Sequence, residues 1–392
     1  LSLIGAEGVF LLYSRSQTEG QRLLTCIPAM LLCYWCFGYG AWLCLALMLA
    51  AGIIAHHQKL SALLAAGILL LPATQYPATT WWSKPDLDRE YVLSLDVEHY
   101  FGNIQKMRKH LETDRQILWV TYYRNLYNAT HPSEINSPVS LSRNLLAWNQ
   151  PGTNGLILPV NPSASFLSIL FANELWFTLG DMTMAEHCAM LSMIFSPRNS
   201  GSRMIKRLAE INLVNGDDEA ALKYLRILDK TLLHKSWAEK RIPGQQTPRV
   251  KEWLEKKRRD IPTQDHLRSG NDAVTSLRNL VASNAGNLRA YEYLLCYHLL
   301  SKDLRSFVED YVPGKVSSSI FAEALLIHLA RQGNIRAEEL IKYQIPVKIA
   351  KEFADYTRLY EAKDTSLKEK YGKTYWFYYH FATTEPGKES KP

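Results

Sequence analysis

Long apolar runs separated by short polar segments dominate the first part of the chain. Between residues 23 and 58 there is no Asp, Glu, Lys or Arg, and one straight helix of that length would measure roughly 54 Å. The hydrocarbon core of a membrane is only about 30 Å thick, so the run is better divided at the Gly-Tyr-Gly turn, 38–40, into two short spans. Another span follows at about 60–71 and somewhat beyond. The pattern therefore predicts transmembrane helices within residues 1–76.

Charged and aromatic residues indicate how such spans would be oriented. The polar segments between them carry Arg15, Arg22 and Lys59, whereas the 38–40 turn is uncharged and flanked by aromatic residues. Cytoplasmic loops are enriched in Lys and Arg, and aromatic belts mark membrane interfaces. We therefore expect the turn to lie outside and the rest of the chain to lie in the periplasm of a bacterium. A single tilted span over 23–58 would instead place it in the cytoplasm.

From about Asp86 onward the apolar positions recur at helical spacing, and strand-like alternation is scarce. Gly180 ends one amphipathic stretch, and Ala185, Ala189 and Pro197 follow five, nine and seventeen residues later. Tetratricopeptide-type repeats place small residues and proline at these intervals. The reason is physical: Gly permits a tight turn, the alanines let two helices approach closely, and Pro stops the second helix.

The same spacing recurs, because Ala221 follows Gly216 by five residues and the two glycines are 36 positions apart. Weaker copies have turns at Ser301 and Gly333, and another turn is expected near Gly102. Stacked helix pairs of this kind form α-solenoids. The predicted fold class is therefore all-α, with N-terminal transmembrane helices followed by a tetratricopeptide-like α-solenoid.

The predicted divisions are as follows: 1–76, transmembrane helices truncated at the N-terminus; 77–85, interfacial linker; 86–240, first helical-repeat block; 241–270, basic linker and bridging helix; 271–382, second helical-repeat block with an aromatic capping helix; 383–392, disordered tail.

Two segments permit a structural and a functional interpretation. The basic run 249–260 fits a solvated helix that bridges the two blocks, or a contact with anionic lipid or another polyanion. The aromatic run 370–381, "KYGKTYWFYYHF", fits a packing helix that covers the open face of the last repeat, because a helix that is apolar nearly all round is usually buried. The alternative is an aromatic ligand cage. The packing interpretation predicts that Tyr375, Trp376 and Tyr379 are largely inaccessible.

Candidate chemistry is sparse. Cys33 and Cys36 have the spacing of a redox motif, but they lie in an apolar helical pattern without the strand and helix that such a motif needs. Cys188 and Cys296 are too far apart in a solenoid for us to expect a disulfide. The histidines show neither HExxH nor zinc-type cysteine spacing. We predict no metal site.

Acidic residues add no recognisable active site. The pair Glu98-His99 could act in acid–base chemistry, whereas Asp217–Glu219 is better interpreted as the acidic start of a helix after Gly216. Nucleophile elbows, P-loops and dinucleotide-binding glycine motifs are absent from the sequence. We therefore identify no catalytic residue and no cofactor, and whether the protein is an enzyme is left uncertain. Ligand-binding residues are unknown at this point.

The charge excludes one class of partner. The net charge of +7 is spread over 45 basic and 38 acidic residues. This is a mildly basic surface rather than the concentrated stripe expected of a nucleic-acid-binding protein.

Three long segments, "KRLAEINLVNGDDEAALKYLRILDKTLLHKSWAEK", "AYEYLLCYHLLSKDLRSFVEDY" and "YGKTYWFYYHF", resemble a family of uncharacterised multi-pass membrane proteins of Bacteroidetes-type bacteria. The resemblance covers most of the chain up to Phe381. It implies several spans followed by a tetratricopeptide-like tail, and further spans before Leu1. It implies no activity.

Together these observations predict a membrane-anchored helical-repeat protein that serves as a scaffold, or as a protein- or peptide-binding component, of the bacterial cell envelope. The expected location is the inner membrane, with the soluble part in the periplasm. The expected partners are membrane lipids and a protein or peptide on the solenoid surface, without nucleic acid or metal. The alternative is the helical-repeat tail of a multi-pass, lipid-linked glycosyl transferase whose active site lies in spans outside this chain.

Overall fold

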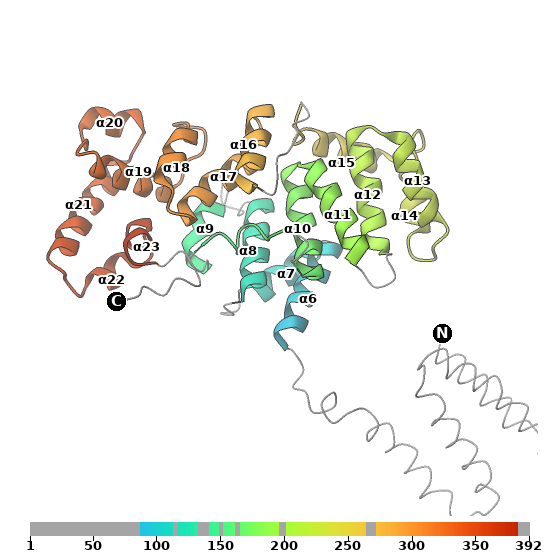
Figure 1. Cartoon of the computed structure of the whole chain (residues 1–392), viewed down its shortest axis with the longest axis horizontal. Helices are drawn as coiled ribbons and strands as arrows, with labels where there is room; N and C mark the ends of the chain where they lie inside the picture. Colours follow the sequence, from blue (N-terminus) through green and yellow to red (C-terminus); the bar gives the residue numbers. More distant parts are fainter. Residues whose placement is uncertain are drawn as a thin grey trace, which may run out of the picture. The chain divides into compact units, whose positions relative to one another are not determined.

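The computed structural model describes residues 87–112, 117–131, 141–148, 152–160, 165–195, 201–263 and 272–382 (Figure 1). These residues form α-helices joined by short turns, and no β-strand occurs among them. The helices are α6 (Leu87–Phe101), α7 (Ile104–Leu111), α8 (Leu118–Thr130), α9 (Leu141–Trp148), α10 (Phe166–Leu179), α11 (Met182–Phe195), α12 (Ser202–Asn215), α13 (Asp218–Asp229), α14 (Lys235–Glu239), α15 (Pro248–Arg258), α16 (Ala273–Ser283), α17 (Leu288–Leu300), α18 (Leu304–Asp310), α19 (Ser319–Arg331), α20 (Ala337–Lys342), α21 (Val347–Glu361), α22 (Leu367–Tyr371) and α23 (Tyr375–Phe381). The all-helical part of the predicted fold class is confirmed for this part of the chain.

The membrane-spanning part of that prediction is not supported. Among the residues that the structure describes, no helix is long and apolar enough to cross a membrane. The longest of them, α6 and α21, have 15 residues each, whereas a spanning helix needs about 20 apolar residues. The segment 1–76, on which the prediction rested, lies outside the described residues. The fold class is corrected to all-helical, and the expected location at the inner membrane stays a prediction.

Backbone contacts divide the chain into two units, 1–87 and 88–392, and the helices described here lie in the second unit apart from the first residue of α6. Within it, α10, α11, α12 and α13 pack successively, each against the next (Figure 1). The turns expected at Gly180 and Gly216 are present, and both glycines have the left-handed backbone that favours this residue, with φ of +89° and +83°. Asp217 then caps α13 by accepting a hydrogen bond from the Ala220 N–H at 2.9 Å.

The weaker turns differ in detail from the expectation. Gly333 has a positive φ of +65°, as a glycine turn requires. At the other predicted turn the left-handed residue is Lys302, with φ of +59°, while Ser301 is right-handed. Ser301 is therefore not the equivalent of a glycine, and the following helix α18 is capped by Asp303, which accepts from the Ser306 N–H.

One connected hydrophobic core extends from α6 to α23. Its largest side chains are aromatic, and α10 is buried along most of its length because it is apolar nearly all round. Tyr122 donates its hydroxyl to the Phe171 carbonyl at 2.6 Å, which ties α8 to α10. Helix α9 packs against both α8 and α17, and its Ser142 N–H donates to Glu292 at 2.9 Å.

The aromatic run near the C-terminus forms two helices rather than the single one expected. Helix α22 ends at Tyr371 and α23 begins at Tyr375. Tyr375 and Trp376 are buried as predicted, but Tyr379 is only half-buried. Tyr375 donates to the Leu299 carbonyl at 2.9 Å, and the Trp376 indole donates to the Glu323 carbonyl at 3.0 Å. These two hydrogen bonds join α23 to α17 and to α19.

Candidate functional site

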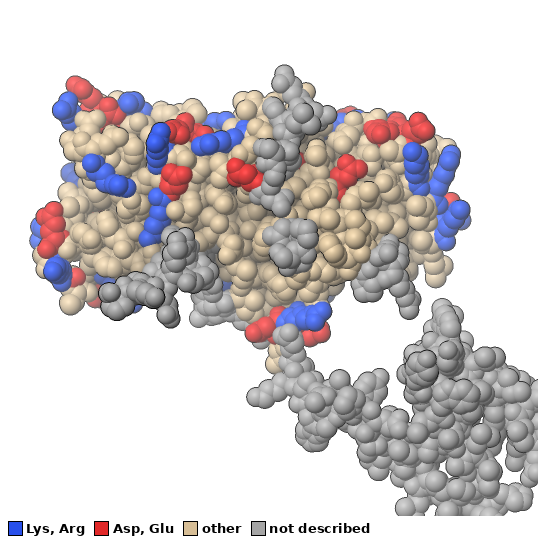
Figure 2. Space-filling model, in the orientation of Figure 1, with Lys and Arg blue, Asp and Glu red and all other residues tan. Residues whose placement is uncertain are grey.

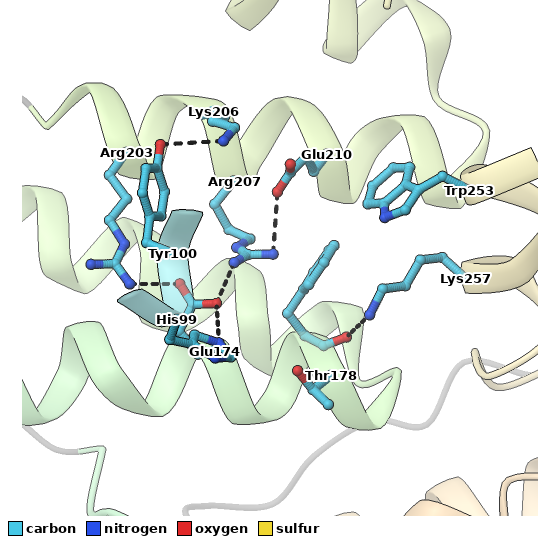
Figure 3. Close-up of a pocket in the computed structure, with 11 residues that line it drawn as sticks. His99, Tyr100, Glu174, Thr178, Arg203, Lys206, Arg207, Glu210, Trp253 and Lys257 are labelled. Carbon is cyan, nitrogen blue, oxygen red and sulfur yellow. Dashed lines mark hydrogen bonds and ion pairs between the residues drawn. The ribbon is translucent and has the colours of Figure 1, made fainter. Parts of the chain in front are cut away.

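A cavity of about 230 Å³ opens where α6, α10, α12 and α15 meet (Figure 3). Its lining residues are His99, Tyr100, Glu174, Phe177, Thr178, Arg203, Lys206, Arg207, Glu210, Trp253 and Lys257. Four of the eleven are Lys or Arg and two are Glu, so the lining carries an excess of positive charge. Three more are Tyr, Phe or Trp, which supply apolar walls.

Glu174 is the central acidic group of the cavity. It extends from α10 and is only 4% exposed. Arg203 donates to one carboxylate oxygen at 2.8 Å and Arg207 to the other at 2.6 Å. The ring nitrogen Nε2 of His99 lies 3.6 Å from the second oxygen. Figure 3 shows these three side chains converging on the carboxylate from α6 and α12.

Asp96 extends the same network toward α8. Arg203 also donates to both of its carboxylate oxygens, at 2.5 and 2.8 Å. The buried hydroxyl of Tyr123 donates to Asp96 at 2.5 Å. Two carboxylates and two guanidinium groups therefore join α6, α10 and α12, and the Tyr123 hydroxyl adds α8. Each charge has an oppositely charged partner, as buried charges require.

The pKa shifts follow from this pairing. Burial alone would raise the pKa of Glu174, but Arg207, the contact with His99 and Arg203 outweigh burial and hold it well below its ordinary value. Burial alone would lower the pKa of Arg203, but Glu174 and Asp96 reverse this and raise it. Both groups are therefore charged at neutral pH. These paired charges form an ionic floor to the cavity.

Aromatic rings hold the other cations of the cavity. The Arg207 guanidinium lies 3.8 Å from the centre of the Phe177 ring, and the Lys257 ammonium lies 4.5 Å from it on α15. Phe177 also stacks against Trp253. On the other side, Lys206 lies 4.5 Å from the centre of the Tyr100 ring. Such cation–π contacts stabilise a positive charge without neutralising it.

Lys206 and Lys257 make no ion pair with any described residue. Lys206 donates to the Tyr100 hydroxyl at 3.3 Å, and Lys257 donates to the Phe177 carbonyl at 3.4 Å. Burial, followed by the positive charges of Arg207 and of Arg289, lowers the pKa of Lys257 to about 8. An ammonium group in this position would gain from an anion placed next to it, because its burial is not compensated by any carboxylate in contact with it.

The basic run 249–260 has a local structural role that the sequence did not reveal. Its helix, α15, packs on α12, and Arg258 donates to the Leu213 and Val214 carbonyls at 2.7 and 3.0 Å. Lys257 similarly contacts the last turn of α10. Cations at helix C-termini satisfy free carbonyls and oppose the negative end of the helix dipole. The run therefore contacts the C-terminal turns of α10 and α12, both inside the first predicted block, and a bridge between the two blocks stays a prediction.

The residues singled out in the sequence are dispersed. His99 reaches the cavity, but its neighbour Glu98 does not line it. Another histidine, His298 on α17, lies away from the cavity lining and pairs with Asp310 at 2.8 Å. The two cysteines of this part, Cys188 and Cys296, are free and buried. The described residues contain no group of three or more His, Cys, Asp or Glu placed to hold a metal ion.

Apart from His99 and the basic run 249–260, the cavity residues were missed in the sequence, although one signal was present. Glu174 is the one charged residue in "FLSILFANELWFTL", a helix that is otherwise nearly all apolar. Such a carboxylate is buried, and a buried charge demands a partner. Arg203 and Arg207, four positions apart on α12, lie on one face of that helix. Nothing in the sequence pattern links that face to Glu174.

Fold and cavity together define an all-helical protein with an ion-paired, cation-rich cavity between helix pairs. A family model described as "Family of unknown function (DUF6057)" matches residues 60–382, and the chain belongs to this family. Searches of curated proteins and of solved structures found no match. The resemblance to an uncharacterised family is thus confirmed, whereas a bacterial group, membrane spans or tetratricopeptide repeats find no support in that match.

Proposed function

We propose that this protein binds other proteins through its helix array, and that the cavity between α6, α10, α12 and α15 receives a carboxylate of the partner. The observation that carries the proposal is the pair of ammonium groups, Lys206 and Lys257, that face the cavity without an ion-pair partner among the described residues. The array of helix pairs supports it too, since such arrays offer extended surfaces for peptides and proteins.

The charges of the cavity favour an anion. Arg203 and Arg207 are neutralised by Glu174 and Asp96, so they form the floor and leave the two lysines as the positive groups available to a ligand. A carboxylate accepts hydrogen bonds from ammonium groups that are shorter and stronger than neutral ones. The indole of Trp253 and the ring of Tyr100 provide apolar contacts for the carbon atoms of the partner's side chain, next to its carboxylate.

The size of the cavity favours a single side chain or chain terminus. Pockets for drug-sized molecules typically have volumes of about 300–1,000 Å³, and this cavity has about 230 Å³. The rest of a bound segment would lie on the neighbouring helix surface. An Asp, a Glu or a C-terminal carboxylate in an acidic stretch fits these dimensions and this charge.

A direct test is the fluorescence anisotropy of a labelled, Glu-rich peptide with the full chain. The double variant Lys206→Gln/Lys257→Gln should weaken binding by at least tenfold. Lys351→Gln is the matched control, because Lys351 is exposed on α21 and far along the chain from the cavity residues. Binding should also weaken as the pH rises from 7 to 9, because Lys257 loses its charge with a pKa of about 8.

The outcome against the proposal is equally specific. If both variants bind as the unchanged chain does, the peptide is held by general positive charge and the cavity is not its site. Affinity capture from a cell extract with the same three proteins is a second readout, because a partner held by the cavity should be lost from the double variant alone. The interpretation as the tail of a glycosyl transferase stays a prediction, since it depends on segments outside this chain.

A further inference from the structure

The turn between α13 and α14 carries the most exposed apolar side chains among the described residues. Leu232 is 96% exposed and Leu233 is 85% exposed. Ile227, on the outer side of α13, is 48% exposed. Fully exposed leucines at adjacent positions expose apolar surface to water without a contribution to the core, and such patches mark interaction sites.

This turn is anchored, so the leucines are held outward. Thr231 donates to the Leu228 carbonyl at 2.7 Å and accepts from the His234 N–H at 3.2 Å. Just beyond the turn, Ala238 is buried against α12 and α13 in a small separate hydrophobic cluster. The two leucines therefore form a convex apolar tip on a fixed support.

Positive charge surrounds the tip. Between Ala220 and Ile242 the chain has six Lys or Arg and only two acidic residues. Lys223, Arg226 and Lys230 are exposed, and their spacing places them on the same face of α13 as Ile227. Lys235 and Lys240 are exposed on the other side of the turn. Figure 2 shows Lys and Arg gathered at the end of the unit where Figure 1 places α13.

We propose that this tip, defined as residues 223–240, docks onto an anionic phospholipid surface, with Leu232 and Leu233 entering the interface and the surrounding cations contacting headgroups. The charge is complementary to acidic lipid. The shape favours lipid over protein, because a protein partner would need a pocket that matches two outward leucines, whereas the boundary between headgroups and acyl chains accepts any convex apolar group. Neither the cavity nor its proposed carboxylate ligand is involved.

Photo-crosslinking of the full chain tests this site locally. We would introduce p-benzoylphenylalanine at Leu233, add preformed vesicles of phosphatidylglycerol and phosphatidylcholine, irradiate, and identify adducts by mass spectrometry. The matched control carries the same group at Ile341, which is 76% exposed at the end of α20. We expect phospholipid adducts at position 233 and at most one-tenth as many at position 341.

Charge substitutions test the second half of the proposal. In the position-233 protein, Lys223→Ala/Arg226→Ala/Lys230→Ala should reduce the lipid adducts at least tenfold, since each cation near an anionic surface contributes about fivefold in partitioning. The triple change is confined to exposed positions, and circular dichroism would verify that the helices remain. Lys348→Ala/Lys351→Ala, on α21, should leave the adducts unchanged. Pure phosphatidylcholine vesicles should also give few adducts.

Two results would overturn the proposal. Equal lipid adducts at positions 233 and 341 would mean that the tip has no preference for lipid. Adducts between two chains at position 233, without lipid adducts, would mean that the leucines cover a second copy of this protein.

Discussion

Gly180 lies so close to the backbone of Asp260 that a Cβ atom on the glycine would come within 2.3 Å of the Asp260 carbonyl oxygen. This approach lets Asn287 bridge the two segments, by donating to the Leu179 carbonyl at 2.7 Å and to the Asp260 carbonyl at 2.8 Å. The end of α10, the end of α15 and the start of α17 therefore meet at one point. A glycine is needed there for two reasons, its left-handed backbone and the absence of a side chain.

Gly180→Ala should consequently be among the most damaging single changes. The left-handed backbone alone costs an alanine about 1–2 kcal/mol, and the clash with a backbone carbonyl adds to this because the two segments must separate. We expect a loss of roughly 3 kcal/mol or more in the free energy of unfolding, measured by urea denaturation.

Gly216→Ala is the matched control for Gly180→Ala. Gly216 has a similar φ of +83°, but no atom lies within 4 Å of the position that its Cβ would occupy. It should therefore show only the conformational cost. Equal losses in the free energy of unfolding for the two variants would mean that the close approach to Asp260 does not contribute to the cost of Gly180→Ala.

Close helix packing at two alanines predicts a second set of effects. Ala185 and Ala221 are fully buried, at the start of α11 and α13, where the paired helices approach each other. Replacing either with Leu should overpack the contact and lower the free energy of unfolding by roughly 1–3 kcal/mol. Ala354→Leu, at an exposed position of α21, should change it by less than about 0.5 kcal/mol. Thermal melts of the three variants measure the difference, and unchanged melting of both buried-site variants would contradict close packing at these alanines.

The carboxylate of Glu174 should be essential to stability. Glu174→Gln removes the charge and leaves Arg203 and Arg207 short of a buried partner, which typically costs roughly 3–5 kcal/mol. Glu309→Gln breaks the exposed pair with Arg305, and such surface pairs are worth only about 0–1 kcal/mol. Chemical denaturation of both variants measures the difference. A loss below 1 kcal/mol for Glu174→Gln would show that the network relaxes or admits water.

Acid should act on the same network. The pKa of Glu174 is held well below its ordinary value in the folded chain. The contribution of Glu174 to the free energy of unfolding is therefore fully present above pH 4.5, and it is lost as the pH falls through the folded-state pKa of this carboxylate. Unfolding measured between pH 5 and 2 should show less acid sensitivity in Glu174→Gln than in the unchanged chain.

Glu323 should act in the opposite direction. Burial raises its pKa to about 7, and the charge of Glu352 adds to the rise, while the Tyr375 N–H donates to its carboxylate at 2.6 Å. The folded chain then binds a proton more tightly than the unfolded chain between pH 4.5 and 7, so stability falls as the pH rises through this window. The full effect would be about 3 kcal/mol. Glu323→Gln should remove this slope, whereas Glu338→Gln, exposed on α20, should retain it.

The aromatic helix α23 should be a stability element. Trp376 is buried against Phe353 and Tyr356, and Trp376→Ala should cost roughly 3–5 kcal/mol, because the cavity left behind adds to the lost transfer energy. Phe381, which is half exposed, should cost less than 1 kcal/mol when it is replaced by Ala. Deletion of Tyr371–Phe381 should cause aggregation. A soluble, cooperatively melting deletion variant would contradict the packing role.

Local structure in the array is determined by the sequence alone. Gly180 and Gly216 end helices because left-handed backbone is accessible to glycine at little cost. Asp217 caps the following helix because its carboxylate satisfies a free N–H. The apolar character of "YWFYYHF" determines its burial. These effects act within a few residues, so they can be predicted without knowledge of the partner surface.

Other predictions from the sequence were wrong, because the same residues are compatible with more than one helix boundary or turn position. The aromatic run was expected to form one helix, yet it divides at Gly372, and Tyr379 is half-buried because α23 presents that position to the edge of α19, where Arg331 donates to its hydroxyl. Ser301 was placed in a glycine-like turn that Lys302 occupies. The membrane spans expected in 1–76 lie outside the described residues, and the helices that are described do not support them.

The candidate site was decided by tertiary structure only. The sequence indicates that Glu174 is buried and needs a positively charged partner. That this partner is Arg203, 29 positions away, depends on how α12 packs beside α10. Lys257 reaches the same cavity because α15 packs on α12. There Lys257 contacts the carbonyl of Phe177, which lies 80 positions earlier in the chain. Charge pairs between distant segments are not encoded by periodicity. They arise because many weak apolar contacts bring the helices together, and only that packing determines which charges lose water and must find one another.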